Sequence, residues 1–141
     1  MTIGAILRGR SGPVISAQPG DTVRAVADLL AQNRIGAVPV VDGDAVVGIF
    51  SERDIVRLIS SYGPDALDRR IDDVMTKSPV TCEPNMAVIA ALSQMTQKRI
   101  RHLPVVEGGK MVGFVSIGDL VKYRIDRIEA EAAAMRDYIA S

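Results

Sequence analysis

The feature that most constrains this chain is an internal repeat. When the 141-residue sequence is shifted by 65 residues, positions 13–57 align with positions 78–122 without a gap, and 15 of the 45 pairs are identical. Most other pairs are conservative, for example Ile15 with Val80 and Asp42 with Glu107. A fixed internal period is the signature of a duplicated supersecondary unit. We therefore expect two copies of one unit, joined by a polar segment around residues 60–73.

Both copies predict the same order of elements. A short β-rich run (14–17 or 80–83) precedes a segment whose apolar residues recur at helical spacing: Val23, Val26, Ala27 and Leu30, then Val88, Ala91, Leu92 and Met95. Two more β-rich runs flank a glycine-containing turn and predict a hairpin, over 37–41 and 45–50 or over 103–106 and 110–115. Each hairpin leads into a helix that starts near Ser51 or Ser116.

These patterns predict an α+β fold in which a β-α-β-β-α unit occurs twice. One such unit is too small to be stable alone, so we expect the two copies to pack together with pseudo-two-fold symmetry. Related clefts then follow between the copies. We expect repeat 1 over residues 1–62, repeat 2 over 63–122 and a C-terminal amphipathic helix over 123–141.

Composition excludes several classes of function. The chain has 17 basic and 17 acidic side chains, which argues against a general nucleic-acid binder or membrane-surface protein. A single Cys and a single His provide neither a disulfide nor a zinc site of nitrogen and sulfur ligands within one chain. We expect a cytoplasmic protein with no signal peptide and no membrane span. No nucleophile–base pair or phosphate-binding loop is visible, so we expect no enzymatic activity.

The most specific motif spans the hairpin and the start of the following helix in each copy. The strings RIGAVPVVDGDAVVGIFSERD (34–54) and RIRHLPVVEGGKMVGFVSIGD (99–119) share an apolar-Pro-Val-Val run, a later Gly-apolar-apolar-Ser, and an Asp three residues after that Ser. This pattern resembles the CBS domain, the regulatory repeat named after cystathionine β-synthase, and the resemblance covers about residues 3–122 in tandem. It implies a stand-alone Bateman module that binds an adenosine-containing ligand, such as AMP, ADP, ATP, S-adenosylmethionine or NAD, in clefts between the repeats.

The residues themselves allow two roles for the Ser and Asp of this motif. The spacing from Ser51 to Asp54, and from Ser116 to Asp119, matches the helix capping box, which is a purely structural role. A helix N-terminus also favours an anion, and a nearby carboxylate can accept hydrogen bonds from the two ribose hydroxyls. In the family this Asp binds ribose, and we expect both roles to coexist.

The resemblance implies two sites. The Asp119 site is expected to be lined by Ile15, Ser16, Gly36, Ala37, Val38, Arg101, His102, Ser116 and Asp119. The Asp54 site is expected to be lined by Val80, Thr81, Leu103, Ser51, Arg53 and Asp54. Arg101 and His102, which occupy the positions of Gly36 and Ala37 in the other copy, are either solvated charges beside a turn or phosphate ligands. The two sites should therefore differ in affinity or ligand.

The C-terminal segment carries a separate pattern. Its apolar residues are spaced 4, 3, 4, 3 and 4 apart: Val121, Ile125, Ile128, Ala132, Met135 and Ile139. This heptad seam either lies on the protein's own domain or forms a subunit contact. Because the seam is too short for a stable coiled coil alone, it would supplement another interface in a homodimer. We expect a nucleotide sensor that acts on a regulated protein by a shift in repeat or subunit arrangement; the alternative is a ligand-free scaffold for protein interactions.

Overall fold

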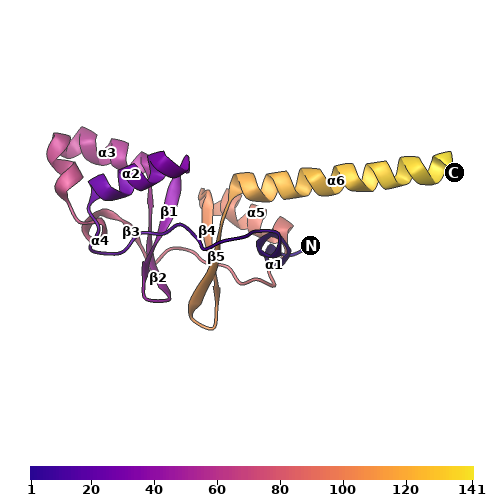
Figure 1. The fold of residues 1–141 in the computed structure, drawn as a ribbon, viewed down its shortest axis with the longest axis horizontal. Coiled ribbons are helices and arrows are strands. Elements are labelled where there is room, and N and C mark those ends of the chain that lie inside the picture. The colour runs from indigo at the N-terminus through magenta and orange to yellow at the C-terminus, as the bar shows by residue number, and fades with distance from the viewer.

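The computed structural model describes residues 1–141 as two similar halves followed by a long helix (Figure 1). The first half contains α2 (Val23–Asn33), β1 (Ala37–Asp42), β2 (Ala45–Ser51) and α3 (Glu52–Tyr62). The second contains α5 (Val88–Lys98), β4 (His102–Glu107), β5 (Lys110–Ser116) and α6 (Ile117–Ala140). Short elements precede each half: α1 (Ile3–Arg8) before the first, and η1 (Gly63–Asp68), α4 (Ile71–Val74) and β3 (Thr76–Lys77) before the second. The predicted α+β fold of two repeats is confirmed.

The predicted helices and hairpins form as their patterns indicate. Helix α2 buries Val23, Val26 and Leu30, and α5 buries the equivalent Val88, Ala91 and Met95. In each antiparallel hairpin the register shifts by one residue at the same place, after Val40–Gly48 in the first and after Val105–Gly113 in the second. Such a β-bulge bends the strand locally. Strand β3 adds to the edge of β2, which gives a three-stranded sheet in the first half and a two-stranded sheet in the second.

The first predicted strand of each repeat is much shorter than expected. Only Ala17 and Cys82 form parallel bridges, to Val40 and Val105 respectively. The Ala17 N–H donates to the Pro39 carbonyl at 3.0 Å, and the Ala17 carbonyl accepts from the Val41 N–H at 2.8 Å. Pairing stops there because the chain turns at once: the Asp21 N–H donates to the Gln18 carbonyl. Each of these two segments, 14–17 and 80–83, is therefore extended and pairs with the hairpin at a single residue.

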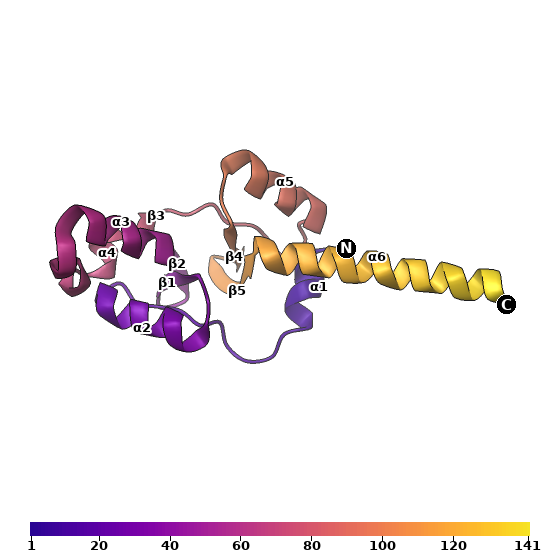
Figure 2. The same cartoon turned by 90° about the horizontal axis from the view of Figure 1, so that it is seen from above.

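The hydrophobic interior is divided into two clusters rather than one shared core. The first repeat's cluster includes Ile71 from α4, and the second repeat's cluster includes Ile3 and Ile6 from α1. Ile6 and Ile71 are 65 residues apart, so they are equivalent positions of the internal repeat, and each packs into the core of the other half. Backbone hydrogen bonds fix both segments, from the Ile3 N–H to the Met86 carbonyl and from the Ile71 N–H to the Asp21 carbonyl. Each half completes its core with a segment that precedes the other half (Figures 1 and 2).

The two halves also contact each other through their hairpins. The Met111 N–H donates to the Asp44 carbonyl at 2.8 Å, and Lys110 Nζ lies 3.8 Å from the Asp44 carboxylate. Both hairpins lie on the inner sides of the halves, so β2 and β5 are next to the junction (Figure 1). The helices that follow these strands start there.

Helix α6 extends far beyond the rest of the fold, as both views show (Figures 1 and 2). Its first turn is anchored by Leu120, which is fully buried. The apolar seam beyond that point lies open in the single chain, with Ile128 exposed by 52%, Met135 by 60% and Ile139 by 75%. No helix of the fold combines the length and apolar character required to cross a bilayer.

Candidate functional site

Both predicted capping boxes are present. At the start of α6, the Asp119 N–H donates to Ser116 Oγ at 3.1 Å, and the Ser116 N–H donates to Asp119 Oδ2 at 2.8 Å. At the start of α3, Ser51 and Asp54 exchange the equivalent bonds at 3.3 and 2.9 Å. In each carboxylate the capping bonds use Oδ2. The structural role of the Ser and Asp is therefore fulfilled while Oδ1 of each Asp accepts no hydrogen bond.

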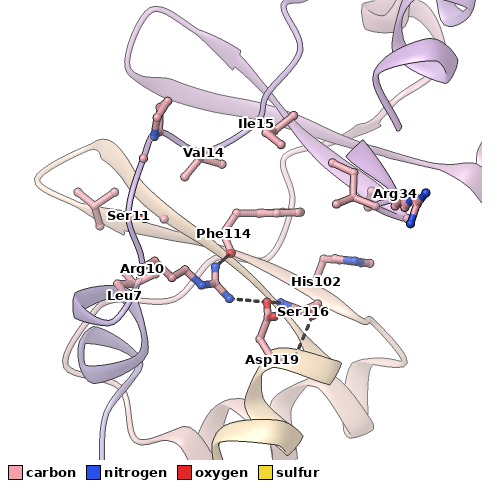
Figure 3. A pocket seen from close by; sticks show the side chains of 17 residues that line it. Leu7, Arg10, Ser11, Val14, Ile15, Arg34, His102, Phe114, Ser116 and Asp119 are labelled. Carbon is pink, nitrogen blue, oxygen red and sulfur yellow. Dashed lines mark hydrogen bonds and ion pairs between the residues drawn. The ribbon is translucent and has the colours of Figure 1, made fainter. Parts of the chain in front are cut away.

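Asp119 lines a cavity of about 560 Å³ at the junction of the halves (Figure 3). Its walls come from the segment after α1, from the loop before β1, and from β5 and the start of α6. Six of the nine residues predicted for this site line it: Ile15, Gly36, Ala37, His102, Ser116 and Asp119. Arg101 does not line this cavity but the other one.

Asp54 lines a second cavity, of about 400 Å³. A shift of 65 residues maps most of the first cavity onto it, since residues 13–15 correspond to 78–80 and residues 34–37 to 99–102. Four of the six residues predicted for this site line it: Val80, Ser51, Arg53 and Asp54. The related clefts expected from the repeat are both present.

The predicted residues that miss the cavities do so because successive residues of an extended chain point to opposite sides. Ile15 and Val80 line the cavities, whereas their neighbours Ser16 and Thr81 are exposed elsewhere. The same alternation separates Ala37 and His102 from the residues that follow them. Val38 and Leu103 are fully buried in the two hydrophobic clusters and do not reach a ligand space.

Arg10 is the main cavity residue that the sequence did not indicate. Its Nη2 lies 2.6 Å from Asp119 Oδ2, and its Nη1 donates to the Phe114 carbonyl at 2.6 Å (Figure 3). Arg10 lies before the aligned segment, and the same shift of 65 residues places it opposite Met75, so the repeat gave no signal for a charge there. Only the exchange of α1 onto the second repeat brings Arg10 to Asp119.

This environment sets the charge of Asp119. Burial works to raise the pKa of the carboxyl group, but the Ser116 backbone N–H and the Arg10 guanidinium outweigh it and lower the pKa overall. Asp119 is therefore an anion at neutral pH. A ligand group that approaches Oδ1 must donate hydrogen bonds to a carboxylate.

His102 stands between the two cavities and lines both. Its ring stacks on Phe114 with a centroid distance of 5.4 Å and an interplanar angle of 9°. Burial lowers the pKa of His102, and the charge of Arg101 lowers it further, while the charges of Asp119 and Glu52 oppose the shift. The imidazole is therefore neutral at pH 7 and offers an aromatic wall rather than a cation.

Comparison with known sequences agrees with the motif. The profile of the CBS domain matches residues 6–61 and again residues 71–126. The CBS domain-containing protein YhcV of Bacillus subtilis is 32% identical over 120 residues, which cover 85% of this chain and 85% of that protein. The mitochondrial CBS domain-containing protein CBSX3 of Arabidopsis thaliana is 35% identical over 124 residues, which cover 84% of this chain and 60% of that protein.

Solved structures agree with the fold. A CBS-domain containing protein from Agrobacterium tumefaciens superposes with a TM-score of 0.81 at 36% identity, covering 87% of this chain and 92% of that one. A CBS domain protein from Pyrobaculum aerophilum, solved in complex with AMP, superposes with a TM-score of 0.75 at 29% identity, covering 84% and 89% of the two chains. With two matched repeats, the paired cavities and these relatives, the chain belongs to the CBS domain family as a tandem pair.

Proposed function

We propose that this protein is a non-enzymatic sensor of adenine nucleotides, with AMP, ADP, ATP or NAD as the candidate ligands. The observation that carries the proposal is the pair of related cavities, each with a carboxylate at a helix N-terminus whose Oδ1 is free of hydrogen bonds. The AMP complex of the Pyrobaculum aerophilum protein supports the ligand class.

Each cavity offers the groups that a nucleoside needs. In the Asp119 cavity, Oδ1 of the carboxylate has capacity to accept hydrogen bonds from ribose hydroxyls, and Ile15 and Ala37 offer apolar surface to a base. The N-terminal amides of α6 favour a negatively charged group nearby. Because each cavity is lined by both repeats, the binding energy of a nucleotide favours one arrangement of the halves over others.

The test is a titration with adenosine, AMP, ADP, ATP and NAD, followed by calorimetry. We expect at least one nucleotide to bind, and Asp119→Asn or Asp54→Asn to weaken binding in its own cavity by about tenfold, because a charge-assisted acceptor becomes a neutral one. Asp137→Asn, on the exposed part of α6, is the matched control and should leave binding unchanged. No heat and no thermal stabilisation with any of these compounds would rule out the sensor and favour the scaffold interpretation.

We also propose that the protein is a cytoplasmic homodimer whose α6 seam joins two copies. The exposed side chains of Ile128, Met135 and Ile139 support this assembly, since an apolar stripe of this length is costly to leave in water. Sedimentation velocity tests it: Ile128→Glu with Met135→Glu should shift the protein toward monomer, whereas Glu131→Gln should not. A wild-type protein that sediments as a monomer at all concentrations would contradict the assembly.

A further inference from the structure

Basic side chains are divided unequally between the two cavities. The Asp54 cavity is lined by Arg53, Arg57, Arg99 and Arg101, and the Asp119 cavity by Arg10 and Arg34. The division does not follow from the repeat alone, because Arg53 corresponds to Gly118 and Arg101 to Gly36. The two cavities therefore have the same architecture but different electrostatics.

The ion pairs of these arginines increase the electrostatic difference between the two cavities. In the Asp119 cavity, Arg10 is already neutralised by Asp119 at 2.6 Å, which leaves only Arg34 without a carboxylate partner. In the Asp54 cavity, only Arg57 has a carboxylate within 4 Å, and that contact to Asp54 is long, at 3.8 Å, from an arginine that is 76% exposed. Contacts of this kind contribute little energy.

Three arginines of the Asp54 cavity are therefore free to meet an anion: Arg53, Arg99 and Arg101, all exposed and none in an ion pair. Two carboxylates, Glu52 and Asp54, line the same cavity, so its formal charge is positive even after both are counted. Guanidinium groups suit phosphate oxygens because their donors form a planar fork.

We propose that the Asp54 cavity is selective for the phosphate chain of a nucleoside di- or triphosphate, whereas the Asp119 cavity takes a nucleoside with one phosphate at most. The assignment of the nucleoside rests on the proposed function, while the preference for a phosphate chain rests on the arginines alone. The smaller Asp54 cavity holds the nucleoside, and the further phosphates lie along the exposed guanidinium groups at its rim. Each added charge opposite an unpaired arginine strengthens binding about fivefold at contact distance in water.

Two substitutions at equivalent positions give a matched test. Arg99 and Arg34 each end a helix in the left-handed region, with φ of 54° and 53°. Glycine adopts this backbone without strain, so Arg99→Gly and Arg34→Gly remove a guanidinium and leave the fold intact. Arg99 lines the Asp54 cavity and not the Asp119 cavity, whereas Arg34 lines the Asp119 cavity and not the Asp54 cavity.

The experiment follows backbone amide signals by NMR during titration of the full chain with adenosine, AMP, ATP and inorganic tripolyphosphate. Gly12 and Gly113 report on the Asp119 cavity, and Ile49 and Ser78 report on the Asp54 cavity. From AMP to ATP, we expect the affinity at Ile49 and Ser78 to rise at least tenfold and the affinity at Gly12 and Gly113 to change less than threefold. Arg99→Gly should reduce this gain about fivefold, because it removes one of the three unpaired arginines, and Arg34→Gly should preserve it.

The two proposals fail in different ways. If tripolyphosphate shifts the Ile49 and Ser78 signals while no adenine compound binds, the preference of the Asp54 cavity for a phosphate chain is supported and the nucleotide-sensor proposal is contradicted. If AMP and ATP bind each cavity equally, or ATP prefers the Asp119 cavity, the charge preference is overturned and the sensor stands. If tripolyphosphate and ATP leave the Asp54 cavity unchanged, the preference is also overturned.

Discussion

Two equivalent glycines should respond differently to the same substitution. Gly48 on β2 and Gly113 on β5 both face an exchanged segment, α4–β3 in one case and α1 in the other. A Cβ built on Gly48 would meet Met75 Sδ, and it would lie 2.8 Å from Met75 Cγ and 2.9 Å from the Thr76 carbonyl oxygen. The three atoms nearest to a Cβ on Gly113 all belong to the Leu7 side chain, with its two methyl groups at 2.5 and 2.7 Å. We expect Gly48→Ala to destabilise the protein much more than Gly113→Ala.

The magnitude follows from what each neighbour can do. The Thr76 carbonyl belongs to β3, whose residues pair with β2 at Ile49 and Gly48, so it cannot move without breaking the sheet. Overpacking against such a group costs about 1–3 kcal/mol, and the lower entropy of the unfolded alanine chain offsets about 0.4–1 kcal/mol of it. For Gly113→Ala, Leu7 can rotate away, so the two effects nearly cancel. We expect a free energy of unfolding lower by roughly 1–2 kcal/mol for Gly48→Ala and changed by less than about 0.5 kcal/mol for Gly113→Ala.

Urea denaturation of both variants and wild type at one protein concentration measures these differences. The midpoint should fall for Gly48→Ala without a change in slope, and the melting temperature should fall by roughly 4 °C per kcal/mol. The result that refutes the reasoning is a Gly113→Ala variant as unstable as Gly48→Ala. It would mean that a mobile Leu side chain and a fixed carbonyl resist a new methyl group equally.

Three further predictions concern titrating side chains. Arg10→Met, which installs the residue found at the equivalent position 75, should raise the pKa of Asp119 in a carbon-detected NMR titration. It should change the free energy of unfolding by less than about 1 kcal/mol, because both side chains of the ion pair are more than a third exposed. An unchanged pKa of Asp119 would contradict the role of the ion pair. Because the pKa of His102 is lowered in the folded state, the unfolded chain binds the proton more readily, and stability should fall as pH drops from above 6.5 toward the folded pKa. Urea midpoints at pH 7.5 and 5.5 check this, and a His102→Gln variant with the same pH dependence would show that another group is responsible. Burial raises the pKa of Cys82 to about 11, so the thiol of the folded protein should react with a disulfide reagent at least tenfold more slowly than in urea; equal rates would contradict its burial.

Much of the fold follows from short stretches of sequence. The helical spacing of Val23, Val26 and Leu30, the glycine turn between two β-rich runs, and the Ser-to-Asp spacing of the capping box each concern residues a few positions apart. Local backbone geometry decides such elements, so their pattern predicts them directly. The shift of 65 residues added one long-range inference, the existence of two related cavities.

Tertiary structure decided which side chains line those cavities. Arg10 reaches the Phe114 carbonyl across 104 positions of sequence, because α1 completes the core of the second repeat rather than the first. The same assembly directs Arg101 to the Asp54 cavity and buries Val38 within a hydrophobic cluster. By itself, the sequence determined that the chain contains two repeats and that one helix in each repeat has an Asp in its first turn. Which side chains face those acids depended on how the halves exchange segments, because hydrophobic burial between distant residues, rather than local geometry, fixes that arrangement.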